Sequence, residues 1–485
     1  MRHFQFNPDF HDHNHNHKRA HHTMPYAALR ELTRSAGLAD PDPSRFVITG
    51  TDPLLRTPYK LGTAGAASIA SLGVAVADLW ALRTGRQMSA SVDMRSAMAA
   101  MRAGRHLLVN GAPLPEVVDP ISGYYRVKND RWIFLHCNFP HHRAAAVRVL
   151  GAANNRESVT EKLRAWEGEK LETALMDAGG CGAYVRTASE WQAHPHYAYV
   201  AASPILEIVK IGEAPPEPFD KHGTRPLQGI RVIDMTRVIA GPTCGRTLAE
   251  HGAQVLKITR ADLPSSGVLE IESGFGKYAA DLDLRDPKQN ETLKNLLRQA
   301  DVFSQGYRPG TLAAKGFGPQ ELAELRPGII CTSLCAWGYE GPWRNRRGYD
   351  TVVQSATGMG HLTGDENSPR LQPVSAIDYI AGWTMAFGTM VALGRRAREG
   401  GSWMVKVSLA AAGQWLVGRG TFPTSEISGL PMEPSEEEIA RMTMQTDSVI
   451  GRLTHLGPTI KLSETVPGWS RAPVPLGSDP PAWPQ

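Results

Sequence analysis

The chain has 485 residues, of which 42% are hydrophobic and 21% charged, and its formal net charge is +4. These values indicate two or more globular domains, each large enough for its own core. The mild charge and the lack of basic runs with interleaved aromatics argue against a nucleic-acid-binding surface, but an anionic small ligand fits them. The five cysteines are too sparse for a disulfide framework, so we expect reduced thiols, a cytoplasmic location and no metal centre.

The first 24 residues contain seven histidines within 22 positions and no apolar run of the kind found in signal peptides. We expect residues 1–24 to be a disordered, His-rich leader. Metal binding by these imidazoles is the alternative, but the sequence indicates no ordered ligand shell.

Residues 25–110 read as a helical segment containing a long Ala- and Gly-rich helix over 61–82 that ends near Gly85. A second apolar stretch, PVSAIDYIAGWTMAFGTMVALG, covers residues 373–394. Both stretches approach the length that spans a membrane, yet each holds an Asp and many small residues. We therefore expect two closely packed core helices and no membrane insertion.

Residues 111–222 predict a smaller α+β domain. It opens with a hairpin around Asn129-Asp130 and continues into helices over ESVTEKLRAWEGEKLETALMDAG. The Pro-rich stretch 214–226 reads as a linker.

From residue 223 the pattern changes to alternating strands and helices. Residues 231–234, 242–250 and 254–258 predict strand, helix and strand, a βαβ unit of an open, Rossmann-like parallel sheet with its ligand at the carboxyl ends of the strands. A nicotinamide cofactor is disfavoured, because AGPTCG is not GxGxxG and Arg260 stands where an acid is expected. This α/β domain extends over 223–420. An acidic and then Pro-rich tail over 421–485 predicts a short helix followed by extended chain.

The two halves share an internal repeat. VADLWALRTGRQMSASVDMRSA (76–97) aligns with VALGRRAREGGSWMVKVSLAAA (391–412) at a constant offset of 315, and each copy reads as helix, Gly turn, strand and helix. Asp378, the single charge in the stretch 373–394, then falls opposite Thr63, so only the second copy has the carboxylate.

Five segments together resemble the class III CoA-transferase family, which includes formyl-CoA and carnitine CoA-transferases and α-methylacyl-CoA racemase. These segments are VIDMTRVIAGP (232–242), QVLKITR (254–260), YRPG with KGFG (307–318), RRGYDTVVQSATG (346–358) and D-x3-G (378–382). The front half also resembles the family's small domain, which here precedes the large one, as in a rearranged tandem fusion. The resemblance implies an interlocked homodimer with each site between a large and a small domain.

The resemblance implies that Asp378 is the nucleophile that takes the acyl group. It also implies a coenzyme A pocket formed by Arg237, Val238, Ala240, Arg260, Tyr307, Lys315, Arg347, Tyr349 and Asp350. No cofactor is expected to stay bound, since acyl-CoA and a carboxylic acid are the substrates.

Several of these residues have simpler interpretations. Asp378 suits the N-terminus of a helix, where it would cap free N–H groups. Asp350 has a salt bridge to Arg346 or Arg347 as its alternative role. Lys277 reads either as part of the family's basic pair or as a solvated lysine.

The sequence departs from the family pattern at Gly306, Ala314 and Ile239 around the expected pocket, although Lys315 is placed to substitute for an arginine expected at 314. Racemases of the family carry His where this chain has Tyr349, which favours transfer over racemisation; His361 is a remote candidate for the missing base. The alternatives to a CoA-transferase are therefore an acyl-CoA racemase or a degenerate acyl-CoA-binding protein.

Overall fold

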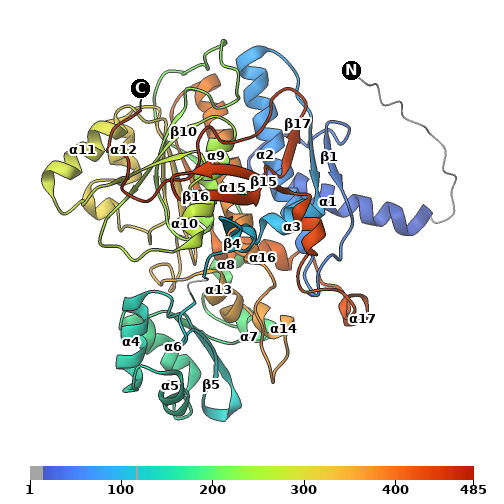
Figure 1. The fold of residues 1–485 in the computed structure, drawn as a ribbon, viewed down its shortest axis with the longest axis vertical. Coiled ribbons are helices and arrows are strands. Elements are labelled where there is room, and N and C mark those ends of the chain that lie inside the picture. Colours follow the sequence, from blue (N-terminus) through green and yellow to red (C-terminus); the bar gives the residue numbers. More distant parts are fainter. Residues whose placement is uncertain (1–14, 116–117, 485) are drawn as a thin grey trace.

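The computed structural model describes residues 15–115 and 118–484, which form a body built on one large sheet, with a smaller lobe at one end (Figure 1). The large sheet has seven strands in the order β11-β10-β9-β12-β13-β14-β8. Their bounds are β8 (Glu207–Gly212), β9 (Arg231–Met235), β10 (Gln254–Thr259), β11 (Lys277–Asp281), β12 (Val302–Gln305), β13 (Ile330–Cys335) and β14 (Ser402–Ser408). All neighbours are parallel except β14 and β8. The predicted parallel sheet is confirmed.

Helices cover both faces of this sheet. Val232 belongs to the core beneath α9 and α15, whereas the next residue, Ile233, belongs to the core beneath α11 and α12. This alternation follows from the two-residue period of a strand buried on both faces. The helices of this half are α9 (Ala240–Glu250), α10 (Val268–Ser273), α11 (Pro287–Leu297), α12 (Pro319–Leu325), α13 (Asp350–Ala356), α14 (Met359–Thr363), α15 (Ala376–Glu399) and α16 (Leu409–Val417).

The front half begins with helix α1 (His15–Ser35), so the helix predicted from residue 25 starts earlier. Residues 1–14 of the expected leader lie outside the described residues. After α1 follow β1 (Phe46–Thr49), α2 (Leu61–Thr84), β2 (Ala90–Asp93) and α3 (Met94–Ala100), with short strands β3 (Leu108–Val109) and β4 (Ala112–Pro113). Three 3-10 turns lie at Ala103–His106, Lys128–Asp130 and Ala313–Lys315.

The internal repeat is present in three dimensions. Helices α2 (61–84) and α15 (376–399) have bounds that differ by 315 at both ends, and they pack against each other. Thr57 Oγ1 donates to Gln372 Oε1 at 2.5 Å, and these two residues are also 315 apart. Equivalent residues of the two copies are therefore in direct contact.

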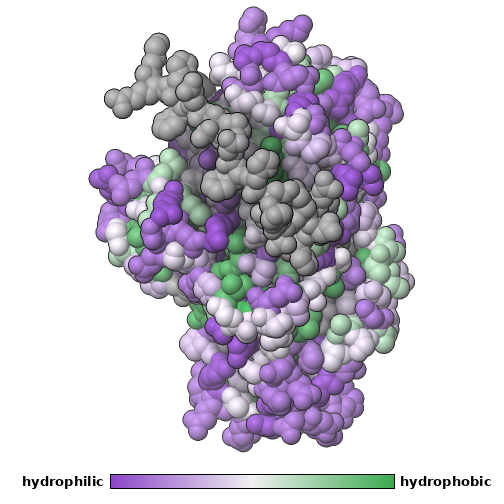
Figure 2. All heavy atoms as spheres, turned by 90° about the vertical axis from the view of Figure 1, so that its right-hand side faces the viewer, coloured by the Kyte–Doolittle hydropathy of each residue, from purple (hydrophilic) through white to green (hydrophobic). Residues whose placement is uncertain are grey.

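Both repeat helices are long and apolar enough to span a membrane, but most of that length is buried inside the protein. The apolar window of α15 is 100% buried and that of α2 is 78% buried. The face of the molecule that Figure 2 shows is mostly hydrophilic. Within the described residues, therefore, α2 and α15 are core helices, as their small residues predict.

The smaller lobe lies at the lower end of Figure 1. It contains the antiparallel strands β5 (Gly123–Arg126), β6 (Trp132–Leu135) and β7 (Gly182–Tyr184) with helices α4 (Pro140–Leu150), α5 (Arg156–Leu163) and α6 (Gly168–Asp177). The predicted hairpin is confirmed. Helices α7 (Ala188–Gln192) and α8 (Tyr197–Ala202) lead back to β8, which joins the large sheet although it falls within the predicted small domain.

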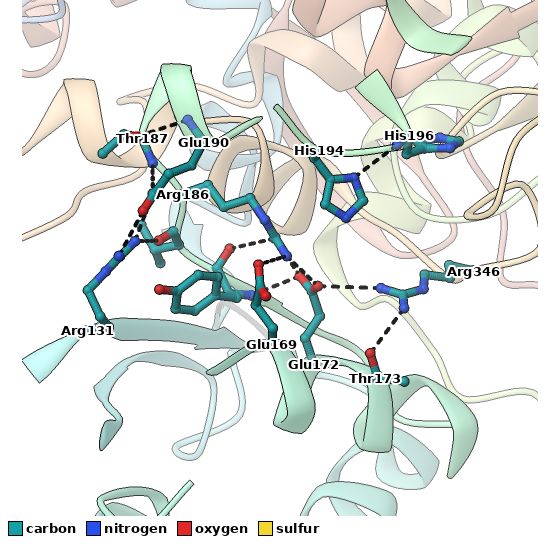
Figure 3. Close-up of polar contacts among 12 residues, drawn as sticks. Arg131, Glu169, Glu172, Thr173, Arg186, Thr187, Glu190, His194, His196 and Arg346 are labelled. Atoms are coloured by element: carbon teal, nitrogen blue, oxygen red, sulfur yellow. Dashed lines mark hydrogen bonds and ion pairs between the residues drawn. The ribbon is translucent and has the colours of Figure 1, made fainter. Parts of the chain in front are cut away.

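A buried ion network connects this lobe to the large domain (Figure 3). The Arg186 guanidinium donates to both carboxylate oxygens of Glu172, at 2.9 and 2.8 Å, and both side chains are almost fully buried. Arg346 lies 3.5 Å from the same carboxylate. The loop that carries Tyr349 and Asp350 is thereby tied to α6.

The tail contains more regular structure than its composition predicts. Helices α17 (Thr424–Ile427) and α18 (Glu436–Ala440) precede strands β15 (Thr443–Ser448), β16 (Gly451–Leu456) and β17 (Ile460–Leu462). Strand β15 pairs with β16, whereas β16 and β17 pair with β3 and β2 of the front half, partners more than 300 residues away that no local pattern reveals. The remaining chain is extended, as predicted, and bonds to the edge of β11 through Asp479 N–H and Ala279 O.

Candidate active site

A cavity of about 310 Å³ lies where the front half, the small domain and the large domain meet. The front half lines it with Met101, Arg102, Gly104 and Arg105. The small domain contributes Val118, His136, Asn138 and Phe139. The large domain contributes, among others, Val238, Ile239, Leu269, Tyr349, Asp350, Leu371, Val374, Asp378 and Tyr379. One chain therefore supplies walls from both kinds of domain.

Asp378 lies in the first turn of α15 and is 6% exposed. No other described residue donates a hydrogen bond to its carboxylate. The interpretation of Asp378 as a helix cap is wrong, because Ser375 occupies the N-cap position and another carboxylate accepts from the helix. Asp350 Oδ2 accepts from the N–H groups of Ile377 and Asp378, at 2.9 and 3.2 Å. Capping by Asp350 leaves the Asp378 oxygens available to the cavity.

Asp350 is itself the first residue of α13 and is 4% exposed. Its other oxygen accepts from Gln354 Nε2. The alternative of a salt bridge to Arg346 or Arg347 is wrong, because Arg346 pairs with Glu172 and neither arginine forms an ion pair with Asp350 among the described residues. The N–H groups at the start of α15 and the Gln354 side chain, rather than arginines, supply the hydrogen-bond donors of Asp350.

Burial disfavours the charge of both carboxylates, and the charge of Asp350 adds to the effect on Asp378. Burial raises the pKa of Asp350 to about 6, although its three hydrogen bonds oppose this rise. Burial, and then the charge of Asp350, raise the pKa of Asp378 well above its ordinary value. This is the expected behaviour of two carboxyl groups in one poorly solvated site, of which only one has donors.

Tyr349 forms one wall of the cavity and stacks on His136, with ring centroids 4.1 Å apart and ring planes at 5°. Val238, in the loop between β9 and α9, has a φ of 75°, which is rare for a β-branched residue and costs conformational energy. Val238 lines both the main cavity and an adjoining pocket of about 30 Å³.

Arg237 lines the adjoining pocket, donates to Pro264 O and lies over the Phe139 ring at 5.4 Å. The pKa of Tyr307 is raised by burial, and the charges of Arg237 and Arg260 oppose that rise, so these three residues lie near one another. Burial lowers the pKa of His141, and the charges of Arg347 and Arg237 lower it further. Arg347 and Arg237 therefore both lie near His141.

The remaining expected pocket residues do not line the cavity. Arg260 pairs with Asp262 at the end of β10, and that carboxylate competes with any anionic ligand. Lys315 is exposed in a 3-10 turn, and Ala240 is buried as the first residue of α9. Their roles toward coenzyme A stay predictions.

Lys277 is not a solvated lysine. It is 3% exposed, and its ammonium lies 2.8 Å from the fully buried carboxylate of Asp234 and 2.8 Å from Pro242 O. The pair holds β11 against β9 and the start of α9, which supports the loop that carries Val238.

The sequence did not single out His136, Asn138 or Phe139 as site residues. They follow β6 in the small domain and lie more than 230 residues before Asp378. Nothing in their local pattern indicates which surface of the large domain they face. Among residues 15–115 and 118–484, no group of three or more His, Cys, Asp or Glu side chains is arranged to hold a metal ion.

Comparison with known proteins finds similarity to one family. Residues 227–443 match the model of CoA-transferase family III. The acetyl-coenzyme A transferase nodX of Hypoxylon pulicicidum is 30% identical over 322 residues, which are 61% of this chain and 54% of that protein. The human succinyl-CoA:glutarate CoA-transferase is 33% identical over 188 residues, 36% of this chain and 42% of that protein.

A crystal structure of Rv3272 from M. tuberculosis shares 30% identity over 39% of this chain and 57% of that chain, with a TM-score of 0.36. The chain thus spans about half the length of the curated relatives named here. Through residues 227–443, the chain is similar to CoA-transferase family III.

Proposed function

We propose that this protein is a CoA-transferase that moves coenzyme A between carboxylic acids through a covalent acyl-enzyme at Asp378. The observation that carries the proposal is the Asp378 carboxylate, which borders a cavity without a hydrogen-bond donor of its own. Relatives named as acetyl-CoA and succinyl-CoA transferases support acyl-CoA and a carboxylic acid as the two substrates.

In the proposed reaction an Asp378 oxygen bonds to the thioester carbon, and the carbonyl electrons move onto oxygen. Collapse of this intermediate expels coenzyme A as its thiolate and leaves a mixed anhydride on Asp378. The thiolate then attacks the aspartyl carbonyl, which gives an aspartyl-CoA thioester and releases the first acid. The second acid's carboxylate repeats the sequence in reverse and leaves as the new thioester. No proton is gained or lost overall.

Asp350 keeps the nucleophile free in this scheme. Because it takes the N–H groups at the start of α15, Asp378 loses no nucleophilicity to those donors. Burial leaves the Asp378 carboxylate poorly solvated, and both this burial and the charge of Asp350 disfavour its ionisation. A carboxylate in such surroundings is a stronger nucleophile than one in water.

Racemisation is the second candidate and has less support. Tyr349 stands where a racemase needs a base, and His361 does not line the cavity. A degenerate binding protein is the third, because Thr63 replaces the acid in the first repeat and Arg260 does not face the cavity. The open cavity beside Asp378 favours the enzyme, since a degenerate site is expected to fill.

The homodimer and the cytoplasmic location remain predictions. All five cysteines are buried free thiols, which fits a reducing compartment. Because all three parts of one chain line the cavity, we infer a site that closes within one chain.

Intact-protein mass spectrometry tests the proposal. Wild type and Asp378→Ala are incubated with short-chain acyl-CoAs and quenched with hydroxylamine. We expect a hydroxamate adduct at Asp378 in the wild type and none in the variant. Binding of coenzyme A by the wild type without any adduct, whichever ester is offered, would contradict the acyl-enzyme.

A further inference from the structure

The small-domain wall of the cavity contains two neutral polar side chains with hydrogen-bonding capacity to spare. His136 and Asn138 follow β6 and line the same cavity as Asp378. The reaction as described above uses neither of them.

His136 presents one particular nitrogen to the cavity. The residue is 7% exposed, and no other described residue forms a hydrogen bond with its ring nitrogens. Nδ1 is fully buried, whereas Nε2 is not, so Nε2 is the nitrogen that reaches the cavity. Burial lowers the pKa of His136 to about 4, so the ring is neutral at pH 7. With its proton on Nε2, the neutral ring presents an N–H group to the cavity.

Asn138 is oriented by two donors. Its Oδ1 accepts from Asp119 N–H at 3.1 Å and from Ser122 Oγ at 2.6 Å. These contacts determine which end of the amide is oxygen and leave the Nδ2 protons without a partner among the described residues. The amide nitrogen is thus a second fixed donor on the same wall.

We propose that His136 and Asn138 are the catalytic residues that hold the oxyanion formed when Asp378 attacks a thioester; this inference rests on the proposed function. When the Asp378 oxygen bonds to the thioester carbon, negative charge develops on the former carbonyl oxygen. His136 Nε2–H and Asn138 Nδ2–H donate to that oxygen. Both remain neutral and transfer no proton, and the charge leaves with the thiolate when the intermediate collapses.

Neutral donors suit this task in a site that already holds two carboxylates. A cationic donor would pair with Asp378 and occupy the nucleophile, whereas a neutral N–H does not. The stack of His136 on Tyr349 fixes the ring, and Tyr349 precedes Asp350, which caps the helix carrying Asp378. Nucleophile and donors are therefore oriented by one connected set of contacts.

Rapid-quench measurement of acyl-enzyme formation tests the inference. His136→Phe keeps an aromatic ring for the stack but removes the donor. We expect acylation to slow by about 10²–10³-fold with little change in KM, the usual effect of losing one oxyanion donor. His136→Gln, which restores an N–H, is expected to recover part of the rate. His361→Gln is the control, because His361 lies outside the cavity lining.

Asn138→Asp tests the second donor, since a carboxylate still accepts from Asp119 and Ser122. If Asn138 is a donor, its substitution lowers the plateau of the profile of acylation rate against pH. A purely electrostatic effect on Asp378 would only move the pH at which the plateau is reached, and that result would overturn the assignment of Asn138.

The outcomes separate the two proposals. A wild-type adduct with His136→Phe acylating within threefold of the wild-type rate would overturn the assignment of His136 and leave the proposed function standing. No adduct in the wild type would overturn both.

Discussion

Asp378 and Asp350 line one cavity but differ in their hydrogen bonds. Asp350 has three donors and is the better anion, while Asp378 has none and remains the harder of the two to ionise. The two acids differ in ease of ionisation because Asp350, and not Asp378, caps α15. Two consequences can be measured, one on activity and one on stability.

Asp350→Asn should move the acid limb of the profile of kcat/KM against pH to lower pH. The change removes the negative charge that raises the pKa of Asp378, so Asp378 ionises more readily. The measurement is kcat/KM between pH 4.5 and 8.5, with Asp447→Asn on the exposed β15 as the matched control. An unchanged acid limb would show that the two carboxylates do not interact.

Asp378→Asn should stabilise the protein at high pH. An acid whose pKa is raised in the folded state contributes stability below its unfolded pKa and loses it as pH rises through the folded pKa. The variant has no such loss, so its free energy of unfolding should exceed that of wild type by on the order of 1 kcal/mol at pH 8. The difference should vanish toward pH 4. Urea unfolding at both pH values checks the sign, and a variant less stable at pH 8 would contradict it.

Helix α15 brings Asp378 to the cavity because small residues let α9 approach it closely. A Cβ on Gly382 would overlap the Ala240 carbonyl oxygen and lie 2.8 Å from Thr243 Cβ. Gly382 is one turn after Asp378, on the same face of the helix. The D-x3-G spacing thus places the nucleophile next to the loop that holds Val238.

Gly382→Ala should destabilise the protein by about 1–3 kcal/mol and reduce acylation, because the backbone of α9 has to move. Gly394→Ala on the same helix is the control. Its new methyl group would meet only the side chains of Asp78, at 3.1 Å, Arg398 and Leu79. Helix propensity favours Ala there, so its stability should change by about 1 kcal/mol or less. Thermal unfolding of both variants gives the comparison, and equal stabilities would contradict the packing argument.

The described chain contains two copies of the repeat, of which only the second has an acid at the position of Asp378. The cap is kept in both copies, since Asp52 accepts from the N–H groups of Gly62 and Thr63 just as Asp350 accepts from Ile377 and Asp378. The first copy has Thr63 at the position of the nucleophile. The front half therefore supports the second copy rather than forming another site of the same kind.

One acyl group per chain is the expected stoichiometry, and activity should not depend on assembly. Specific activity should stay constant when the protein is diluted from micromolar to nanomolar concentration, because residues of the front half, the small domain and the large domain of one chain line the same cavity. Quantitative mass spectrometry and a dilution series measure the two quantities. Loss of specific activity on dilution would show that the site is shared between chains.

Local patterns determined much of this molecule. The βαβ unit, the core helices, the hairpin and the position of Asp378 at the start of α15 follow from periodicity, turn residues and spacing, which act over a few residues. The repeat also follows from the sequence, down to the missing acid at Thr63. The tertiary structure alone decided which acid caps α15, that β16 and β17 pair with the front half, and that His136 and Asn138 line the same cavity as Asp378. Each of these depends on contacts between segments far apart in the chain, and the free energy of such contacts is set by packing in three dimensions rather than by local propensity.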